Sequence, residues 1–469
     1  PWGVYWDRVI VVVIEPGVTS IGVFAFEGCS SLTSVTIPEG VTSIGIGAFS
    51  GCSSLTSVTI PEGVTSIGDH AFTGCRSLTS VTIPEGVTSI GEGIFWCCSS
   101  LTSVTIPEGV TSIGYYAFCE CSSLASVTIP EGVTSIGGGA FEDCISLTSV
   151  SIPEGVVSID GGAFQGCSSL TSVSIPESVT SISNAAFSGC SSLTSVTIPD
   201  SVTSIGDYAF HNCSRLKSVE IKGAASIGDS AFYYCERLAD VTFSGNVTSI
   251  GDSAFSDCRR LTNVVLPESV TDIGAEAFSN CERLTSVAMP GVISIGADAF
   301  SGCENLTDVA LPKSVSSVAG NVFTYCYNLE RISVDKENGT YISADGVLFD
   351  KNCTTLITYP TAKKNTVYNI PKSVTTIVSG AFLDCDSLTS VTIPEGVTSI
   401  GDYAFFGCSA LASVNIPKGV TSIGKATFLG CNLTKLTIPE GVTQIGDDAF
   451  HDCDRLTSVV IPGSVASIG

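Results

Sequence analysis

The sequence predicts a repeat solenoid, in which stacked coils of 22 or 23 residues build parallel β-sheets joined by short turns. Three observations lead to this fold class. A nearly invariant string recurs along almost the whole chain, each copy holds two short β-branched segments bounded by turn signals, and one copy is too small to fold alone. The coils are expected to form a curved or extended rod.

The period is read from the leucine that opens the L-T-S-V-T-I segment. It recurs in eight steps of 23 residues between Leu32 and Leu216, and afterwards in steps of 22 or 23. One gap, between Leu329 and Leu388, marks an interruption of the array. The full series is Leu32, Leu55, Leu78, Leu101, Leu124, Leu147, Leu170, Leu193, Leu216, Leu238, Leu261, Leu284, Leu306, Leu329, Leu388, Leu411, Leu433 and Leu456.

Each copy of the unit predicts two strands and one compact turn. In the copy that begins at Leu32, the β-branched segments Val35–Ile37 and Val41–Ile44 favour strand, and neither is long enough for a helix. Pro38–Gly40 is a turn signal between them. The A-F-x-x-C-x-x-L segment at Ala48–Leu55 has apolar residues at helical spacing but is very short, which predicts a short α or 3₁₀ turn.

A single coil is not expected to be stable. Its few apolar side chains offset only part of the conformational entropy that is lost when the coil becomes ordered. Neighbouring coils must therefore supply the remaining hydrogen bonds and the second wall around each apolar side chain. Identical residues of successive coils then lie next to one another in ladders.

The consensus L-x-x-V-x-I-P-x-x-V-x-x-I-x-x-x-A-F-x-x-C-x-x-L resembles the BspA-type leucine-rich repeat of bacterial and protist surface proteins, and it covers nearly the whole chain. The resemblance implies a leucine-rich repeat solenoid, an extracellular or cell-surface location and a role in adhesion without a shared catalytic motif. The chain departs from the family in one respect. Its repeats vary little in the V-T-I strand, which such proteins usually present on their concave face.

The repeats divide the chain into four segments. In the first, Trp2 and Trp6 are expected to cover the first coil. In the third, Asp345-Gly346 is a hairpin turn signal, which predicts a small β-meander that projects from the solenoid. Its expected strands are Tyr341–Ser343, Val347–Phe349 and Thr355–Tyr359. The segments are 1–8, the remnant of a cap; 9–333, a leucine-rich repeat array; 334–366, the β-meander insertion; and 367–469, a second array.

The last unit stops after Ile468, before its Ala-Phe turn. Two expectations follow from this unit. Either the chain is a piece of a longer array, or chains associate head to tail so that one chain completes the next. Contacts of the second kind do not close and would generate a filament.

Composition limits the partners. The chain has 20 basic and 45 acidic residues and a formal net charge of −25, which excludes nucleic acid and anionic membranes as partners. The longest apolar run, Val9 to Ile14, is too short for a transmembrane segment.

The 21 cysteines require a separate interpretation. Most of them share one phase of the unit, where a small inward-facing apolar group is needed, and this predicts a buried ladder of thiols. No C-x-x-C pair occurs and the three histidines are scattered, so no metal site is predicted. Cys97 and Cys119 are out of phase and lie one coil apart on the same turn. A disulfide between them is the alternative in an oxidising compartment.

A row of carboxylates marks the Pro-Glu-Gly corner. We interpret it as a solvated edge that keeps an apolar-rich chain soluble, and the alternative is a multivalent site for Ca²⁺ or a polycation. No other cofactor is expected. The ladder begins with Glu39, Glu62, Glu85, Glu108 and Glu131.

No catalytic residues are predicted, because no histidine has a nucleophile and an acid at a recognisable spacing. The chain is interpreted as a non-enzymatic binding or adhesion protein that contacts proteins or glycans, and the alternative is a structural filament component or a rigid spacer. The residues around Ala-Phe vary from coil to coil, so specificity is expected there. Trp96, Tyr115 and Tyr116 place three aromatic side chains on this turn and are the predicted hot spot, unless Trp96 only covers the next coil.

Overall fold

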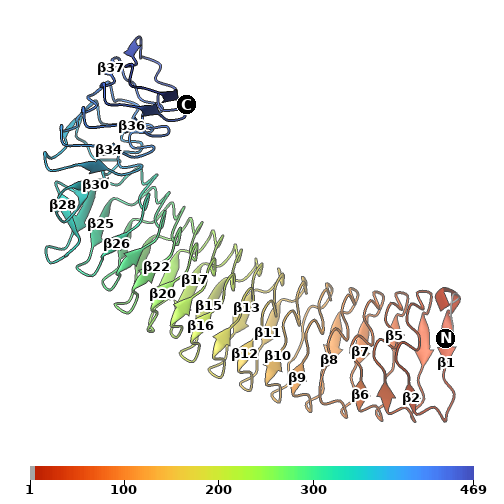
Figure 1. The fold of residues 1–469 in the computed structure, drawn as a ribbon. Coiled ribbons are helices and arrows are strands. Elements are labelled where there is room, and N and C mark those ends of the chain that lie inside the picture. Colours follow the sequence, from red (N-terminus) through yellow and green to blue (C-terminus); the bar gives the residue numbers. More distant parts are fainter. Residues whose placement is uncertain (1–5) are drawn as a thin grey trace. The chain divides into compact units, whose positions relative to one another are not determined.

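The computed structural model describes residues 6–469, and the chain divides into two compact units, Pro1–Val247 and Thr248–Gly469. Within each unit the coils are stacked side by side, and each coil is one copy of the sequence repeat (Figure 1). The predicted solenoid with parallel sheets is therefore confirmed. The cap expected around Trp2 and Trp6 lies outside the described residues, apart from η1 (Trp6–Arg8), a single 3₁₀ turn.

The first strand of a coil comes from the S-V-T-I segment. These strands form short sheets of two or three coils, in which they pair in parallel and in register, so that Val12 lies opposite Val35. The valine points into the core and the flanking Ser and Thr point outward, as the alternation predicts. In the first unit these strands are β1 (Val11–Val13), β3 (Ser34–Thr36), β5 (Ser57–Val58), β7 (Ser80–Thr82), β8 (Ser103–Thr105), β11 (Ser149–Ser151), β13 (Ser172–Ser174), β15 (Ser195–Ile198), β17 (Ser218–Ile221) and β19 (Asp240–Phe243). In the second unit they are β21 (Asn263–Val265), β23 (Ser286–Ala288), β25 (Asp308–Leu311), β27 (Arg331–Val334), β31 (Val367–Asn369), β33 (Ser390–Thr392), β35 (Ser413–Val414), β37 (Leu436–Thr437) and β39 (Val459–Val460).

The second strand of each coil is the short T-S-I segment, which also pairs in parallel, as Ile44 does with Ile67. In the first unit these strands are β2 (Ser20–Ile21), β4 (Ser43–Ile44), β6 (Ser66–Ile67), β9 (Ser112–Ile113), β10 (Ser135–Ile136), β12 (Ser158–Ile159), β14 (Ser181–Ile182), β16 (Ser204–Ile205) and β18 (Ser226–Ile227). In the second unit they are β20 (Ser249–Ile250), β22 (Asp272–Ile273), β24 (Ser294–Ile295), β26 (Ser317–Val318), β32 (Thr376–Ile377), β34 (Ser399–Ile400), β36 (Ser422–Ile423), β38 (Gln444–Ile445) and β40 (Ser467–Ile468).

The core is a set of ladders, one for each apolar position of the repeat. The phenylalanine ladder shows the packing most clearly. Phe164 is fully buried, and its ring lies parallel to those of Phe141 and Phe187, with centroids 5.4 Å away on both sides. Each ring therefore covers the next, and no coil can complete its core without a neighbour.

The in-phase cysteines form a second buried ladder, as predicted. The thiol of Cys75 donates a hydrogen bond to the carbonyl oxygen of Phe49 in the preceding coil, at 3.3 Å, and Cys167 donates to Phe141 at 3.1 Å. Both side chains are fully buried. Each sulfur therefore fills a small apolar site and also satisfies a backbone carbonyl.

The Ala-Phe segment, predicted to be a short α or 3₁₀ turn, forms a series of turns but no helix. In the copy from Gly45 to Cys52 the N–H groups of Ala48, Ser50 and Cys52 donate three residues back, as in isolated turns. The alternating N–H groups, at positions 47, 49 and 51, donate instead to the next coil, at 2.7–2.9 Å. Half of the donors thus bond between coils, and a helix cannot form. We name this segment of each coil the Ala-Phe turn.

The insertion contains the three antiparallel strands expected from its turn signals, namely β28 (Tyr341–Ala344), β29 (Val347–Asp350) and β30 (Thr355–Thr358). It does not project from the solenoid, which corrects the prediction. Strand β30 pairs in parallel with β32, Leu356 opposite Ile377. Phe349 and Leu356 are fully buried in the core of the second unit. The insertion is therefore built into the stack as an irregular coil.

Candidate binding surface on the Ala-Phe turn

The Ala-Phe turn presents two side chains of each coil to the surface in an unusual backbone conformation. The residue before Ala and the second residue after Phe both have positive φ, as in Tyr116 (φ 54°) and Cys97 (φ 59°). Residues other than glycine are uncommon at such φ values. These positions therefore hold either glycine or residues that the surrounding hydrogen bonds keep in place.

The three predicted aromatic residues do lie on this turn. Tyr115 and Tyr116 are 56% and 42% exposed, and Trp96 is half-buried. The rings of Trp96 and Tyr116 are stacked, with centroids 6.0 Å apart and an interplanar angle of 27°. His70 extends the row, with its ring centroid 6.4 Å from that of Trp96. We name these four residues the aromatic patch.

His70 was not included in the predicted hot spot, although the sequence contained a signal for it. It occupies the same place before Ala as Tyr116, two coils earlier. Its Nδ1 lies 3.3 Å from the hydroxyl of Thr73, and its Nε2 lies 3.9 Å from a carboxylate oxygen of Glu92. The patch thus ends in a polar group that can donate or accept a hydrogen bond.

Glycines of the next coil make room for these rings. A Cβ atom on Gly93 would lie 2.3 Å from Nδ1 of His70, and one on Gly139 would lie 2.5 Å from the ring of Tyr116. Both contacts are too short for real atoms, so each ring covers a glycine backbone. The alternation of a ring with a glycine therefore holds His70 and Tyr116 against the surface.

The indole N–H of Trp96 differs from the rest of the patch. The nitrogen is buried, and it has no hydrogen-bond partner among residues 6–469. A buried donor without an acceptor is costly, and such groups are rare in native proteins. Covering the neighbouring coil, the alternative for Trp96, accounts for its half-buried ring but not for this unpaired donor.

Cysteines and acids adjoin the patch on the next positions of the turn. The structure holds Cys97 and Cys119 as thiols, and that of Cys97 donates to Oε2 of Glu120 at 3.3 Å. Burial and this hydrogen bond raise the pKa of Cys97 to about 11, and burial with the charge of Glu142 raises that of Cys119 to about 12. A disulfide between them stays a prediction.

The glutamate ladder lies elsewhere, on the Pro-Glu-Gly corner. Each of its members is exposed, with one carboxylate per coil. In the part of the chain from residue 6 onward, no three His, Cys, Asp or Glu side chains are grouped closely enough to hold a metal ion. Calcium binding by Glu39, Glu62, Glu85, Glu108 and Glu131 stays a prediction.

A second aromatic cluster, which the sequence reasoning did not identify, lies on the Ala-Phe turns of the same unit. The ring of His211 is stacked on that of Tyr233, with centroids 5.5 Å apart, and Tyr208 meets His211 edge to face at 5.8 Å. Burial lowers the pKa of His211. The signal was again the position in the repeat, since His211 occupies the place of Trp96.

No helix in the described part of the chain is long and apolar enough to cross a membrane. In the comparison with curated proteins, nothing matches this chain. The family model for the BspA type leucine rich repeat region (6 copies) matches residues 7–125, 134–261, 225–357 and 358–469.

Among solved structures, the chain is similar to a leucine rich cell surface protein from Faecalibacterium prausnitzii A2-165, with 36% identity and a TM-score of 0.56 over 61% of this chain and 78% of that one. A leucine-rich repeat protein from Eubacterium ventriosum ATCC 27560 matches with 24% identity and a TM-score of 0.44, over 61% of this chain and 83% of that one. The pneumococcal vaccine antigen PcpA matches with 23% identity and a TM-score of 0.39, over 72% of each chain. Because the family model covers nearly all of the sequence, the chain belongs to the BspA-type leucine-rich repeat proteins.

Proposed function

We propose that this chain is a non-enzymatic binding protein of the cell surface or extracellular space, and that it attaches to a protein or glycan partner through the aromatic patch. One observation carries the proposal. The rings of His70, Trp96 and Tyr116 form a partly exposed row on three different coils, and two of them are seated on glycines.

The chemistry of the patch suits recognition. Tyr and Trp bury a large area at little cost in conformational entropy, and they dominate the binding energy of many interfaces. Glu92, Glu120 and Glu142 lie on the same row of turns, and the chain carries a net charge of −25. A neutral or basic partner is therefore favoured over an anionic one. The likeness to a cell surface protein of the same family supports the location.

The test replaces Tyr115 and Tyr116 by serine. Serine occurs at both places in other coils, at Ser379 and Ser230, so the fold should tolerate the change. We expect attachment of the full chain to printed arrays of glycans and extracellular matrix proteins to fall at least about tenfold, which is 1.4 kcal/mol. The melting temperature should change little, because both side chains are exposed.

Tyr208→Ser is the matched control. Tyr208 is 50% exposed and has the same turn position and φ as Tyr116, but it lies outside the patch. Its replacement should leave attachment unchanged. If the double variant attaches as strongly as the natural chain, the patch is not the binding surface.

A structural role is the second candidate. It is favoured by the uniformity of the first strand in the first unit, which reads S-V-T or S-V-S in every coil from Ser34 to Thr197 and presents nearly the same outward face there. A filament component should form ordered polymers of constant width in negative-stain electron microscopy, and these should persist after the Tyr115 and Tyr116 substitutions. A chain that stays monomeric at high concentration would exclude this role.

A further inference from the structure

The insertion shortens one Ala-Phe turn of the second unit. The N–H of Tyr359 donates to the carbonyl of Ala381 at 2.8 Å, as a phenylalanine does in a regular coil, and the ring of Tyr359 is stacked on that of Phe382. Leu356 and Tyr359 are only three positions apart, whereas their partners Ile377 and Phe382 are five apart. The two residues that precede Ala-Phe elsewhere are therefore missing from this coil.

The missing residues leave backbone groups unpaired on the coil before the insertion. In the regular coil that precedes it, the N–H groups at positions 298, 300 and 302 donate to the carbonyls at 320, 322 and 324. The equivalent donors one coil later belong to Asn321, Phe323 and Tyr325. Within residues 6–469 none of these three N–H groups has an acceptor.

The coil after the insertion shows the matching gap. In a regular Ala-Phe turn, three carbonyls accept backbone hydrogen bonds from the preceding coil. In the turn after the insertion, only the carbonyl of Ala381 accepts such a bond. In the described chain, the carbonyls of Ser379 and Leu383 receive no backbone N–H. Donors on one side and acceptors on the other therefore face a common hollow, which we name the notch.

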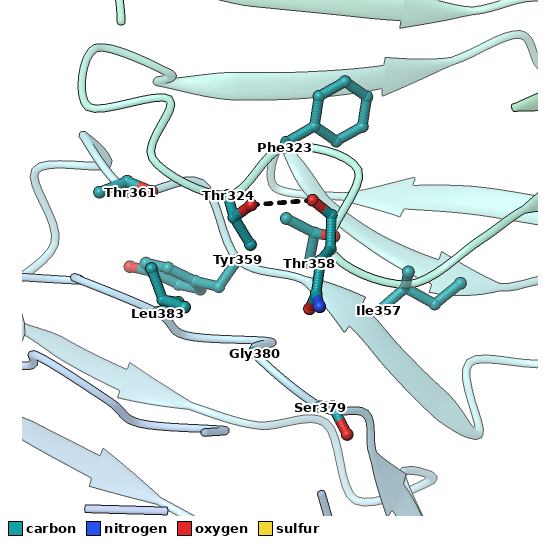
Figure 2. A pocket seen from close by; sticks show the side chains of 10 residues that line it. Phe323, Thr324, Ile357, Thr358, Tyr359, Thr361, Ser379, Gly380 and Leu383 are labelled. Carbon is teal, nitrogen blue, oxygen red and sulfur yellow. Dashed lines mark hydrogen bonds between the residues drawn. The ribbon is translucent and has the colours of Figure 1, made fainter. Parts of the chain in front are cut away.

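The notch has an inner slot and an outer hollow. Figure 2 shows the slot, with Phe323 and Thr324 from one coil, Thr358 and Tyr359 from β30 and its end, and Leu383 from the next coil. The hydroxyl of Thr324 donates to the carbonyl of Asn321 at 3.0 Å (Figure 2). The slot has a volume of about 20 Å³, which is enough for one water molecule.

The outer hollow is larger and partly aromatic. Its volume is about 290 Å³, and Asn321, Thr324 and Leu383 line it together with three aromatic residues and one acid. Tyr325 is 43% exposed and Tyr403 is 36% exposed, on the two sides of the gap. The remaining lining residues are Phe406 and Asp298.

We propose that the notch binds one neutral or amino-substituted pyranose unit of a glycan. The aromatic rings offer flat faces to the C–H groups of a sugar ring, while the unpaired N–H groups of the lining residues Asn321 and Tyr325 and the Asp298 carboxylate suit hydroxyls, which both donate and accept. The volume lies at the lower end for ligand pockets, about 300 Å³, and this favours a monosaccharide over a larger ligand.

Other ligand classes fit less well. An extended peptide is larger than the outer hollow of about 290 Å³, and the slot behind the hollow has room for only one water molecule. An anionic sugar would face the carboxylate of Asp298 in the hollow. The site does not involve the aromatic patch, so either proposal can fail without the other.

The test uses the full chain and a panel of methyl pyranosides of glucose, galactose, mannose and N-acetylglucosamine. Binding is measured by saturation-transfer NMR and calorimetry. We expect at least one glycoside to bind, and the Tyr403→Ala, Phe406→Ser double variant to lose at least about tenfold in affinity. Ala426 and Ser256 occupy the same two places in other coils, so these substitutions preserve the turn.

Two further variants make the outcome decisive. Tyr208→Ala, at the place of Tyr403 in the first unit, should bind like the natural chain. Asp298→Asn keeps the shape of the hollow and should weaken binding through the lost charged acceptor. The proposal is overturned if no glycoside binds, if Tyr403→Ala, Phe406→Ser binds as well as the natural chain, or if an unstructured peptide library binds the notch and no glycoside does.

Discussion

The sulfur atoms of the in-phase cysteines act as packing groups and weak donors. Cys52 and Cys167 are fully buried, and each donates to a phenylalanine carbonyl of the preceding coil, at 3.2 and 3.1 Å. Burial raises the pKa of Cys52 to about 12. At neutral pH the reactive thiolate is therefore scarce, and the sulfur is also shielded from reagents.

We therefore expect alkylation of the native chain at neutral pH to label only the partly exposed cysteines Cys97, Cys353 and Cys453. Cys97 and Cys453 should react slowly, because burial raises the pKa of each to about 11. All 21 should react after denaturation. Peptide mass spectrometry with and without denaturant measures this. Labelling of most in-phase cysteines in the native chain would contradict the buried ladder.

Asp384 on the second unit is held in an unfavourable environment for its charge. Burial, together with the neighbouring carboxylate of Asp386, raises the pKa of Asp384 to about 6. In the unfolded chain an aspartate titrates near pH 4. The folded state thus binds the proton more tightly, and its stability falls as pH rises from about 4 to 6.

Asp384→Asn should for this reason raise the melting temperature at pH 7.5, by about 1–2 °C after allowance for solvent screening. The gain should vanish at pH 4, where the natural carboxyl is largely protonated in the folded state. Calorimetric scans at both pH values measure this. Asp386→Asn, which removes the neighbouring charge, should give a smaller gain with the same pH dependence.

The Ala-Phe turn and the glycine of the next coil act as one element in the aromatic patch. Gly139 and Gly162 occupy the same place in adjacent coils and have similar backbone angles, φ 62° and 66°. Only Gly139 lies under a ring. A Cβ on Gly162 would find its nearest atom, Oε1 of Gln165, at 3.4 Å, which is an ordinary contact.

Gly139→Ala and Gly162→Ala form a matched pair. Both should lose about 1 kcal/mol of folding free energy, because alanine is strained at positive φ. Only Gly139→Ala should also displace Tyr116, which we expect to change the near-ultraviolet circular dichroism and to weaken attachment to the partner. Denaturant titration and the array assay measure the two effects. Equal attachment by both variants would show that the seating of Tyr116 does not matter.

Acidic residues outnumber basic residues in this chain. The chain has 45 acidic and 20 basic residues, and the exposed glutamate ladder adds one carboxylate per coil at one corner. Like charges at coil spacing repel one another, and the repulsion falls as salt screens it. The stack can carry this cost because each coil gains its core and hydrogen bonds from two neighbours.

We therefore expect the melting temperature to rise by about 2–4 °C between low and physiological salt. CaCl₂ and MgCl₂ at equal ionic strength should have the same effect if the ladder is a solvated edge, and Glu85→Gln with Glu108→Gln should reduce the salt dependence. Differential scanning fluorimetry measures both. A larger shift with Ca²⁺ that disappears in this double variant would establish the ladder as a calcium site.

The periodic residues alone were sufficient to predict the stack. The spacing of Leu32 and its counterparts, the β-branched segments and the in-phase cysteines all act locally and repeat, so the parallel sheets and the buried ladders followed from them. The sequence also predicted that Trp96 and Tyr116 are close together, because they belong to adjacent coils and the Ala-Phe turns of adjacent coils lie side by side. Turn signals such as Asp345-Gly346 located the strands of the insertion.

Features that depend on the neighbouring coil could not be predicted from the sequence of a single repeat. The Ala-Phe turn has helical spacing, but its alternate N–H groups bond to the next coil, which no single copy contains. The rings of His70 and Tyr116 lie on glycines 23 residues away, and strand β30 joins the sheet because the core beneath it must be closed. The notch arises for the same reason. Its unpaired N–H groups become visible only when the coil that fails to meet them is in place.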